Sequence, residues 1–263
     1  MHAVGTAGDR PSWALGQRNG VLVTVEGVWG AGKTTVAHDL GQRLEAAGFA
    51  VAVLHNGPTH GAVGRLSQFL ETAPLRSRTG VGGYDASHHA TVDVLLRLCR
   101  EAHHHRTCYR PALAERDVVI IDRGVYAKLA YALAVLAEAD PDVNLDSTLQ
   151  LLHTIVAPWF LHPDLAIHLD TPWPLARERA IARGHGGGNP AAVERLLFLP
   201  RYDAAYRHVL AAHPDRVRRI HVGLREPAAV ADAAVAALAD RLGVALPAAS
   251  TSRHPDVPTG LGK

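Results

Sequence analysis

The run from Gly27 to Thr35 reads GVWGAGKTT and joins three glycines to a lysine and two threonines. Glycines let a backbone wrap closely around phosphate oxygens, so that successive N–H groups and the start of a following helix face the anion. Lys33 would reach the β- and γ-phosphates, and the Thr34 hydroxyl would bind Mg²⁺. We therefore predict a site for ATP and Mg²⁺ that is formed by Gly27, Gly30, Ala31, Gly32, Lys33, Thr34 and Thr35.

Asp122 and Arg123 form a second candidate group, directly after the apolar run 118–121. An aspartate at the end of a buried strand can bind Mg²⁺ directly or through water, and it can orient or deprotonate an acceptor. An arginine can hold a phosphate through two parallel N–H bonds. We expect Asp122 to act in metal binding and catalysis, and Arg123 to act in catalysis and in binding an acceptor that carries a phosphate.

Arg177, Arg179 and Arg183 form a third group beside the glycine-rich run 184–190. On a helix Arg179 and Arg183 share one face, whereas Arg177 points elsewhere. A glycine-rich segment beside cations is typical of a closing lid, which excludes water and brings positive charge to a transferring phosphoryl group. We predict a lid at about residues 177–195, with Arg179 and Arg183 catalytic and Arg177 near the cofactor.

These groups need a scaffold that brings them to one cleft. Short apolar runs at 21–25, 50–55, 118–122, 165–170 and 219–222 alternate with longer segments of helical spacing. Such alternation predicts an α/β fold with a five-stranded parallel sheet and helices on both faces. Ligands of such sheets bind beyond the carboxyl ends of the strands, where Gly27, Asn56, Asp122, Asp170 and Gly223 lie in this interpretation. The segment 126–162 should be helical with a break near residues 140–142, and 228–242 should form a closing helix.

The composition fits one domain and a small anionic ligand. The chain has 263 residues, a net charge of +2 with dispersed basic residues, and two cysteines, Cys99 and Cys108. We expect a domain at 20–246 between disordered tails at 1–19 and 247–263. Neither a nucleic acid polymer nor a membrane is an expected partner, because no basic patch and no apolar run of about 20 residues is visible. We expect a cytoplasmic protein.

Two groups of residues invite a functional interpretation that we do not favour. The consecutive residues His103, His104 and His105 point about 100° apart on a helix, so they cannot converge on one metal ion. We expect them to be solvated or to face the acceptor. We also expect four aromatic residues to pack in the core or between helices, and not to stack on a base: Trp159, Phe160, Phe198 and Tyr202.

The motifs together resemble thymidylate kinases, over roughly residues 21–242. The resemblance rests on VEGVWGAGKTT at 25–35, on Asp122-Arg123 followed by Leu129-Ala130-Tyr131, and on the stretch from Pro163 to Gly184. It implies a P-loop kinase fold, transfer of the γ-phosphoryl group of ATP to a nucleoside monophosphate, and a homodimer. By the same resemblance Arg100 and His103 would help to hold the acceptor nucleotide, and Gly223 would lie along the adenine of ATP.

The sequence departs from the family mainly on the acceptor side. Trp29 replaces an acidic residue of the loop, and the run 56–61 replaces an Arg-Glu-Pro-Gly-Gly motif. After Arg123, Gly124 replaces an aromatic residue, and Tyr126, Ala127 and Lys128 replace small polar ones. The residues assigned to acceptor binding are Trp29, Asn56, Arg100, His103, Arg123 and Tyr126. A site built for hydrogen bonds rejects analogues that lack the bonded groups. Because several polar contacts to the acceptor are replaced here, both thymidine monophosphate and a modified nucleotide stay open as acceptors.

Two other functions stay open. The acceptor of a kinase could be a nucleoside or a specialised small-molecule alcohol, which would need a general base such as His55, Asp85 or Asp122. The chain could also be a regulatory protein that binds ATP without turning over an acceptor.

Overall fold

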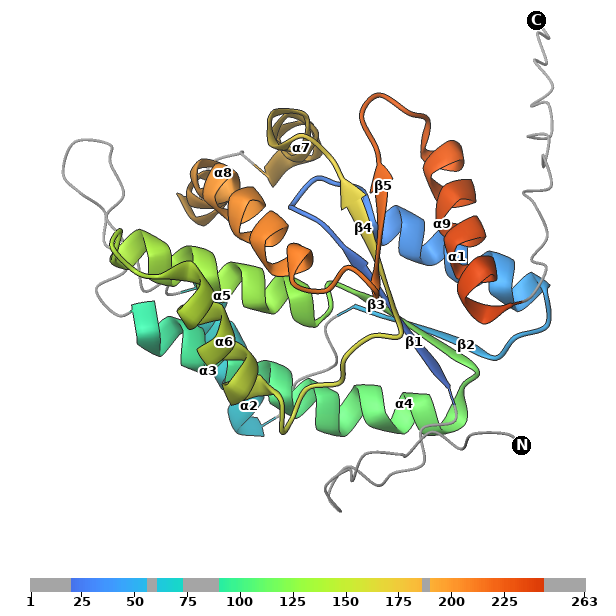
Figure 1. The fold of residues 1–263 in the computed structure, drawn as a ribbon, viewed down its shortest axis with the longest axis horizontal. Helices are drawn as coiled ribbons and strands as arrows, with labels where there is room; N and C mark the ends of the chain where they lie inside the picture. Colours follow the sequence, from blue (N-terminus) through green and yellow to red (C-terminus); the bar gives the residue numbers. More distant parts are fainter. Residues whose placement is uncertain (1–19, 56–60, 73–89, 186–189, 244–263) are drawn as a thin grey trace, which may run out of the picture.

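In this computed structural model the described residues are 20–55, 61–72, 90–185 and 190–243. Their strands form one parallel sheet in the order β2-β3-β1-β4-β5, as Figure 1 shows. The strands are β1 (Val21–Glu26), β2 (Val51–Leu54), β3 (Val118–Asp122), β4 (Leu165–Asp170) and β5 (Val217–His221). The predicted parallel five-stranded sheet is confirmed, although its last strand begins two residues earlier than expected.

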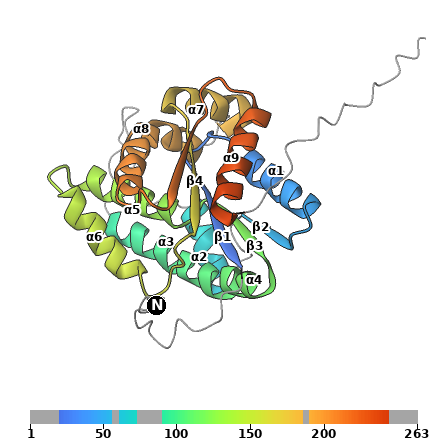
Figure 2. The same ribbon diagram turned by 45° about the vertical axis from the view of Figure 1, so that its right-hand side comes forward.

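Helices cover both faces of this sheet (Figures 1 and 2). Helices α1 and α9 lie together on one face, and α4, α5 and α8 lie on the other, with α3 and α6 packed against α5. The helices are α1 (Lys33–Ala46), α2 (Gly61–Thr72), α3 (Ala90–His104), α4 (Arg110–Glu115), α5 (Val125–Ala139), α6 (Leu145–Val156), α7 (Trp173–Ala180), α8 (Pro190–Ala211) and α9 (Pro227–Leu242). Two π-helical turns extend α3 and α7: η2 (His105–Tyr109) and η3 (Ile181–His185).

The alternation of side chains along the buried strands divides the core between the two faces. In β3, Val119 and Ile121 pack with Tyr109 and Leu113 beneath η2 and α4, whereas Ile120 belongs to the larger cluster shared with α1. Strands buried on both faces are apolar throughout, which is why these segments could be recognised from sequence. The core therefore fixes the carboxyl ends of β1 and β3 side by side.

The break between α5 and α6 also follows the prediction. Helix α5 ends at Ala139, and the Asn144 side chain caps α6 by accepting a hydrogen bond from Ser147 N at 2.9 Å. An asparagine at this position satisfies one of the N–H groups that a helix leaves without partners.

Two sequence predictions are confirmed only in part. Trp159 is 55% exposed, because the chain turns at the end of α6, whereas Phe160, Phe198 and Tyr202 are buried as expected. His104 and His105 are buried and not solvated, because α3 packs against α5 and the His105 ring stacks on Phe160. The predicted tails at 1–19 and 247–263 lie outside the described residues. In the described part of the chain, no helix is long and apolar enough to cross a membrane.

Candidate active site

The glycine-rich loop connects the end of β1 to the start of α1. Gly30 has φ 84° and Gly32 has φ 94°, a backbone region that residues with side chains rarely adopt. A Cβ on Gly30 would overlap the carbonyl oxygen of Ala176, so only glycine lets the loop lie this close to α7. Gly32 precedes α1, and no side chain caps the first turn. The free N–H groups at this helix start are suited to bind an anion.

Lys33 lies folded back on this loop. Its side chain is only 5% exposed, and Nζ donates a hydrogen bond to the Val28 carbonyl oxygen at 2.7 Å. Burial and the positive charge of Arg123 lower the pKa of Lys33 to about 7, although Asp122 and Glu26 act in the opposite direction. A bound triphosphate would supply the negative charge that this buried ammonium group lacks.

Asp122 joins the loop to the end of β3. Its carboxylate is buried, and the Thr34 hydroxyl donates a hydrogen bond to Oδ2 at 2.5 Å. His55 Nδ1 lies 2.8 Å from the same oxygen. The second oxygen, Oδ1, is buried and has no hydrogen-bond partner among the residues that the structure describes. A buried polar atom without a partner is unusual and marks a place for a ligand.

The donors at Asp122 fit Mg²⁺. This ion prefers oxygen ligands and is usually held by one or two protein groups together with phosphates and water. Thr34 and Asp122 supply a hydroxyl and a carboxylate at the start of the phosphate loop helix. Nowhere in the described ranges do three or more histidines, cysteines or carboxylates form a group that could hold a metal ion by itself. Thr34 and Asp122 therefore remain the predicted ligands of Mg²⁺.

Arg123 has an unusual backbone. Its φ is 73°, and it is the only residue other than glycine with a positive φ in the described part of the chain. Such strain persists where the surrounding structure enforces it, often at functional sites. Arg123 N donates to Val25 O at 3.1 Å, which fixes the turn, and the buried Nε has no hydrogen-bond partner among the described residues. The guanidinium group is thus available for an anion beside the loop.

The three arginines of the predicted lid have different environments. Arg179 on α7 donates a hydrogen bond to the Gly223 carbonyl oxygen at 3.1 Å, which links α7 to the turn after β5. Arg183 in η3 is exposed, and its charge contributes to the lowered pKa of Lys33, so the two groups are electrostatically coupled. Arg177 is exposed and stacks over Trp173 at 5.1 Å. Residues 186–189 of the predicted lid lie outside the described residues.

The acceptor-side residues are only partly brought together. The Trp29 ring packs 4.8 Å from the Tyr202 ring, and Arg100 and His103 are half-buried on α3. Tyr126 is fully buried and packs against His213, so the structure does not bring this side chain to the cleft. Asn56 and Asp85 lie outside the described residues. At the phosphate loop Ala31 is buried, and Thr34 and Thr35 are exposed at the start of α1.

Glu26 is a residue of the site that the sequence interpretation did not select. It ends β1 and is fully buried, and its Oε2 accepts hydrogen bonds from Tyr206 Oη at 2.7 Å and Ala127 N at 3.1 Å. Burial raises the pKa of Glu26. The carboxylate therefore ties the strand before the loop to α5 and α8. A carboxylate at the end of an otherwise apolar strand was the signal that could have revealed it.

Comparison with known proteins agrees with this geometry. A family model described as thymidylate kinase matches residues 25–228, which is most of the chain. The chain belongs to the thymidylate kinase family. It is 34% identical over 231 residues to a thymidylate kinase of Xanthomonas euvesicatoria pv. vesicatoria (strain 85-10), covering 85% of this chain and 87% of the relative. It is 36% identical over 229 residues to one of Xanthomonas campestris pv. campestris (strain B100), covering 86% and 87%. The thymidylate kinase of Gluconobacter oxydans (strain 621H) is 30% identical over 226 residues, covering 86% and 97%.

Membership of the thymidylate kinase family confirms the predicted P-loop kinase fold and the predicted enzyme class. The chain is a nucleotide kinase, a phosphotransferase that binds a nucleotide at its P-loop. The matched region includes the loop, Asp122 and Arg123, and the lid arginines. The resemblance stated from the motifs is therefore confirmed, whereas the role of each site residue stays a prediction.

Proposed function

We propose that this kinase transfers the γ-phosphoryl group of ATP, bound with Mg²⁺, to a nucleoside monophosphate, with thymidine monophosphate as the expected acceptor. The observation that carries the proposal is the hydrogen bond between Thr34 and Asp122 at 2.5 Å. It joins the phosphate loop to a buried carboxylate that has one oxygen without a partner. The names of the relatives support the choice of acceptor.

The donor half follows from the loop. The first-turn N–H groups of α1 and the ammonium group of Lys33 would bind the phosphates, while Thr34 and Asp122 would hold Mg²⁺. When bound, Mg²⁺ neutralises charge on the phosphate oxygens and fixes their orientation. Arg179 holds the turn at Gly223, along which the adenine would lie.

The transfer itself needs positioning more than proton chemistry. An oxygen of the acceptor phosphate would form a bond to the γ-phosphorus while the bond from that phosphorus to the bridging oxygen breaks, which releases ADP. A phosphate oxygen is already an anion near neutral pH, so no general base is required. Arg123 would hold the acceptor phosphate, and Arg183 would stabilise the negative charge of the transition state.

A second candidate acceptor is supported by one contact. His55 Nδ1 lies 2.8 Å from Asp122 Oδ2, and the His55 side chain is 47% exposed. A histidine that is held by a buried carboxylate can accept a proton from an alcohol. This pair favours a nucleoside hydroxyl as the alternative acceptor.

An acceptor screen separates these functions. Purified protein with ATP and Mg²⁺ is incubated with nucleoside monophosphates, nucleosides or sugars, and acceptor-dependent release of ADP is measured. We expect release with thymidine monophosphate and loss of that release in Lys33→Ala. Release with a nucleoside alone would favour the hydroxyl acceptor, and tight ATP binding without any release would favour a regulatory protein. The homodimer implied by the family stays a prediction, which sedimentation of the purified chain tests.

A further inference from the structure

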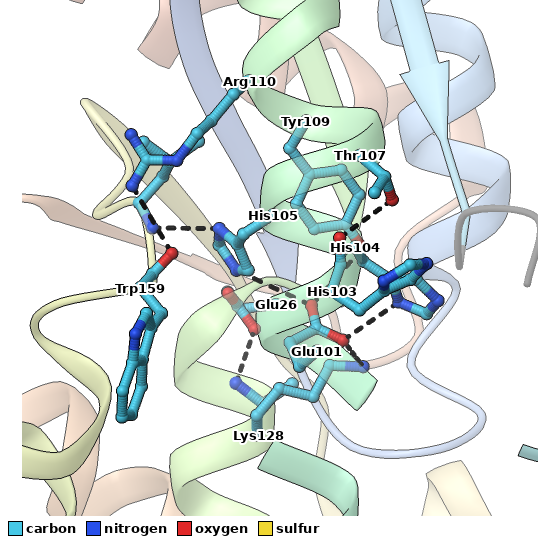
Figure 3. Close-up of polar contacts among 12 residues, drawn as sticks. Glu26, Glu101, His103, His104, His105, Thr107, Tyr109, Arg110, Lys128 and Trp159 are labelled. Atoms are coloured by element: carbon cyan, nitrogen blue, oxygen red, sulfur yellow. Dashed lines mark hydrogen bonds and ion pairs between the residues drawn. The ribbon is translucent and has the colours of Figure 1, made fainter. Parts of the chain in front are cut away.

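A charged cluster lies inside the protein between α3 and α5, near Glu26 at the end of β1 (Figure 3). Its centre is Glu101, whose side chain is 0% exposed. Lys128 Nζ lies 3.1 Å from Glu101 Oε2, and the Lys128 side chain is only 16% exposed. Tyr109 donates a hydrogen bond to Glu101 Oε1 at 3.3 Å. Removing two charges from water is costly, so a buried ion pair is weak support for stability and calls for another explanation.

The π-helical turn η2 brings more polar groups to the same carboxylate. On an α-helix, residues three and four positions after Glu101 share its face, which places His104 and His105 beside it. His104 Nδ1 lies 3.5 Å and His105 Nε2 lies 3.8 Å from the carboxylate oxygens. Tyr109 lies eight positions after Glu101, whereas a regular α-helix returns to the same face after about seven residues. The wider π turn therefore lets the Tyr109 side chain reach Glu101. Figure 3 shows these side chains turned toward Glu101.

The protonation of this cluster is defined by its hydrogen bonds. His105 Nδ1 accepts a hydrogen bond from Leu161 N at 2.9 Å, so its ring is neutral and carries its hydrogen on Nε2, toward Glu101. Burial lowers the pKa of His105 to about 4. Burial alone would raise the pKa of Glu101, but the positive charge of Lys128 and the side-chain contact of His104 outweigh it and lower that pKa to about 2. The carboxylate thus stays charged and remains bound to Lys128.

A second carboxylate connects the same two helices. Asp93 on α3 accepts hydrogen bonds from Tyr131 Oη of α5 at 3.1 Å and from Arg97 Nε at 2.9 Å. The Arg97 guanidinium lies over the Tyr131 ring at 4.7 Å. At a rise of 1.5 Å per residue, Asp93 and Glu101 are about 12 Å apart along α3. Two anchors at this spacing fix both the distance and the angle between α3 and α5.

We propose that Glu101 and Lys128 are positioning residues for the acceptor, holding Arg100 of α3 in register with Arg123 before α5. Glu101 directly follows Arg100, and Lys128 lies on the first turns of the helix that Arg123 precedes. A shift of the helices by a fraction of an ångström would change the spacing of these two guanidinium groups. Apolar residues could fill the same space but would not impose one register. The inference rests on the proposed nucleoside monophosphate acceptor.

The test compares Lys128→Met, Glu101→Gln and the double variant with the parent enzyme. Steady-state kinetics with thymidine monophosphate and ATP give a KM for each substrate, well below each melting midpoint. We expect each single variant to raise the acceptor KM by about tenfold or more and the ATP KM by less than about twofold. The double variant, which has no unpaired buried charge, should regain most of its melting midpoint but keep the raised acceptor KM. Arg218→Met removes a cation from an exposed ion pair with Asp240 and should alter neither KM.

Several outcomes would overturn the inference. A double variant with the acceptor KM of the parent would show that the pair does not position the acceptor. Equal changes in both KM values, or a lower melting midpoint with unchanged kinetics, would show a structural role only. A parent enzyme that phosphorylates no nucleoside monophosphate would refute the proposed function, and this inference with it. An active parent with unaffected variants would refute the positioning role alone.

Discussion

Replacing Lys33 with methionine should stabilise the protein while it abolishes ATP binding. The ammonium group is buried, and its pKa is lowered from 10.5 to about 7. Each pKa unit corresponds to about 1.4 kcal/mol, so the charged form costs about 5 kcal/mol of folding free energy below pH 7. Loss of the hydrogen bond to the Val28 carbonyl would offset about 1 kcal/mol of the gain. Methionine has a similar length and no charge.

The dependence on pH gives this prediction a sharper test. Between pH 7 and 10.5 the unfolded chain still carries the Lys33 proton that the folded chain has released, so the stability of the parent rises with pH in this window. Below pH 7 the full penalty applies. Two pH units above 7, the penalty has fallen by about 3 kcal/mol. The stabilisation by Lys33→Met should therefore be about 2–3 kcal/mol smaller at pH 9 than at pH 6, because other titrating groups cancel in the comparison.

Urea unfolding followed by circular dichroism at both pH values measures this difference, and equilibrium dialysis measures ATP binding. Arg218→Met, which removes an exposed cation, is the matched control and should change stability little at either pH. If Lys33→Met gave no stabilisation at pH 6, or the same stabilisation at pH 9, the assignment of a buried and destabilised ammonium group would be wrong. Undiminished ATP binding would remove the role of Lys33 in the phosphate site.

Other variants test the lid, the metal ligand and a buried histidine. Arg183→Ala should lower kcat by about 100-fold with little change in the ATP KM. Arg179→Ala should lower kcat and also raise the ATP KM, because it removes the hydrogen bond to Gly223. A kcat equal to that of the parent in both variants would refute the predicted lid. Asp122→Asn should lower kcat by about 100-fold or more and weaken activation by Mg²⁺, and an unchanged Mg²⁺ titration would exclude the aspartate as a ligand. Burial lowers the pKa of His168 to about 4, so stability should fall as the pH drops from 6.5 to 4. His168→Gln should reduce that slope by up to about 1.4 kcal/mol per pH unit, as urea midpoints across this range would show, and an unaltered slope would contradict it.

The sequence alone was enough to predict those parts of the protein whose structure depends on residues close together in the chain. The loop from Gly27 to Thr35 is one such part, since its function depends on backbone conformation and on a helix that starts within it. The strand runs were visible because parallel strands buried on both faces are apolar throughout. The break before α6 was visible because Asn144 caps a helix through residues close to it in the chain. The family motifs then indicated the order of these parts.

Only the tertiary structure decided which side chains meet across elements. Nothing near Tyr126 in sequence shows that α5 turns this ring into the core, and nothing near Trp159 shows that its turn faces water. The ion pair of Glu101 and Lys128 joins two helices that are separated by a strand, and each charge alone is typical of a solvated surface. Whether a side chain on a helix is buried depends on which element packs against that face of the helix, and that element is distant in sequence. The sequence by itself therefore determined the fold and the phosphate site, whereas helix packing decided the geometry of the acceptor side.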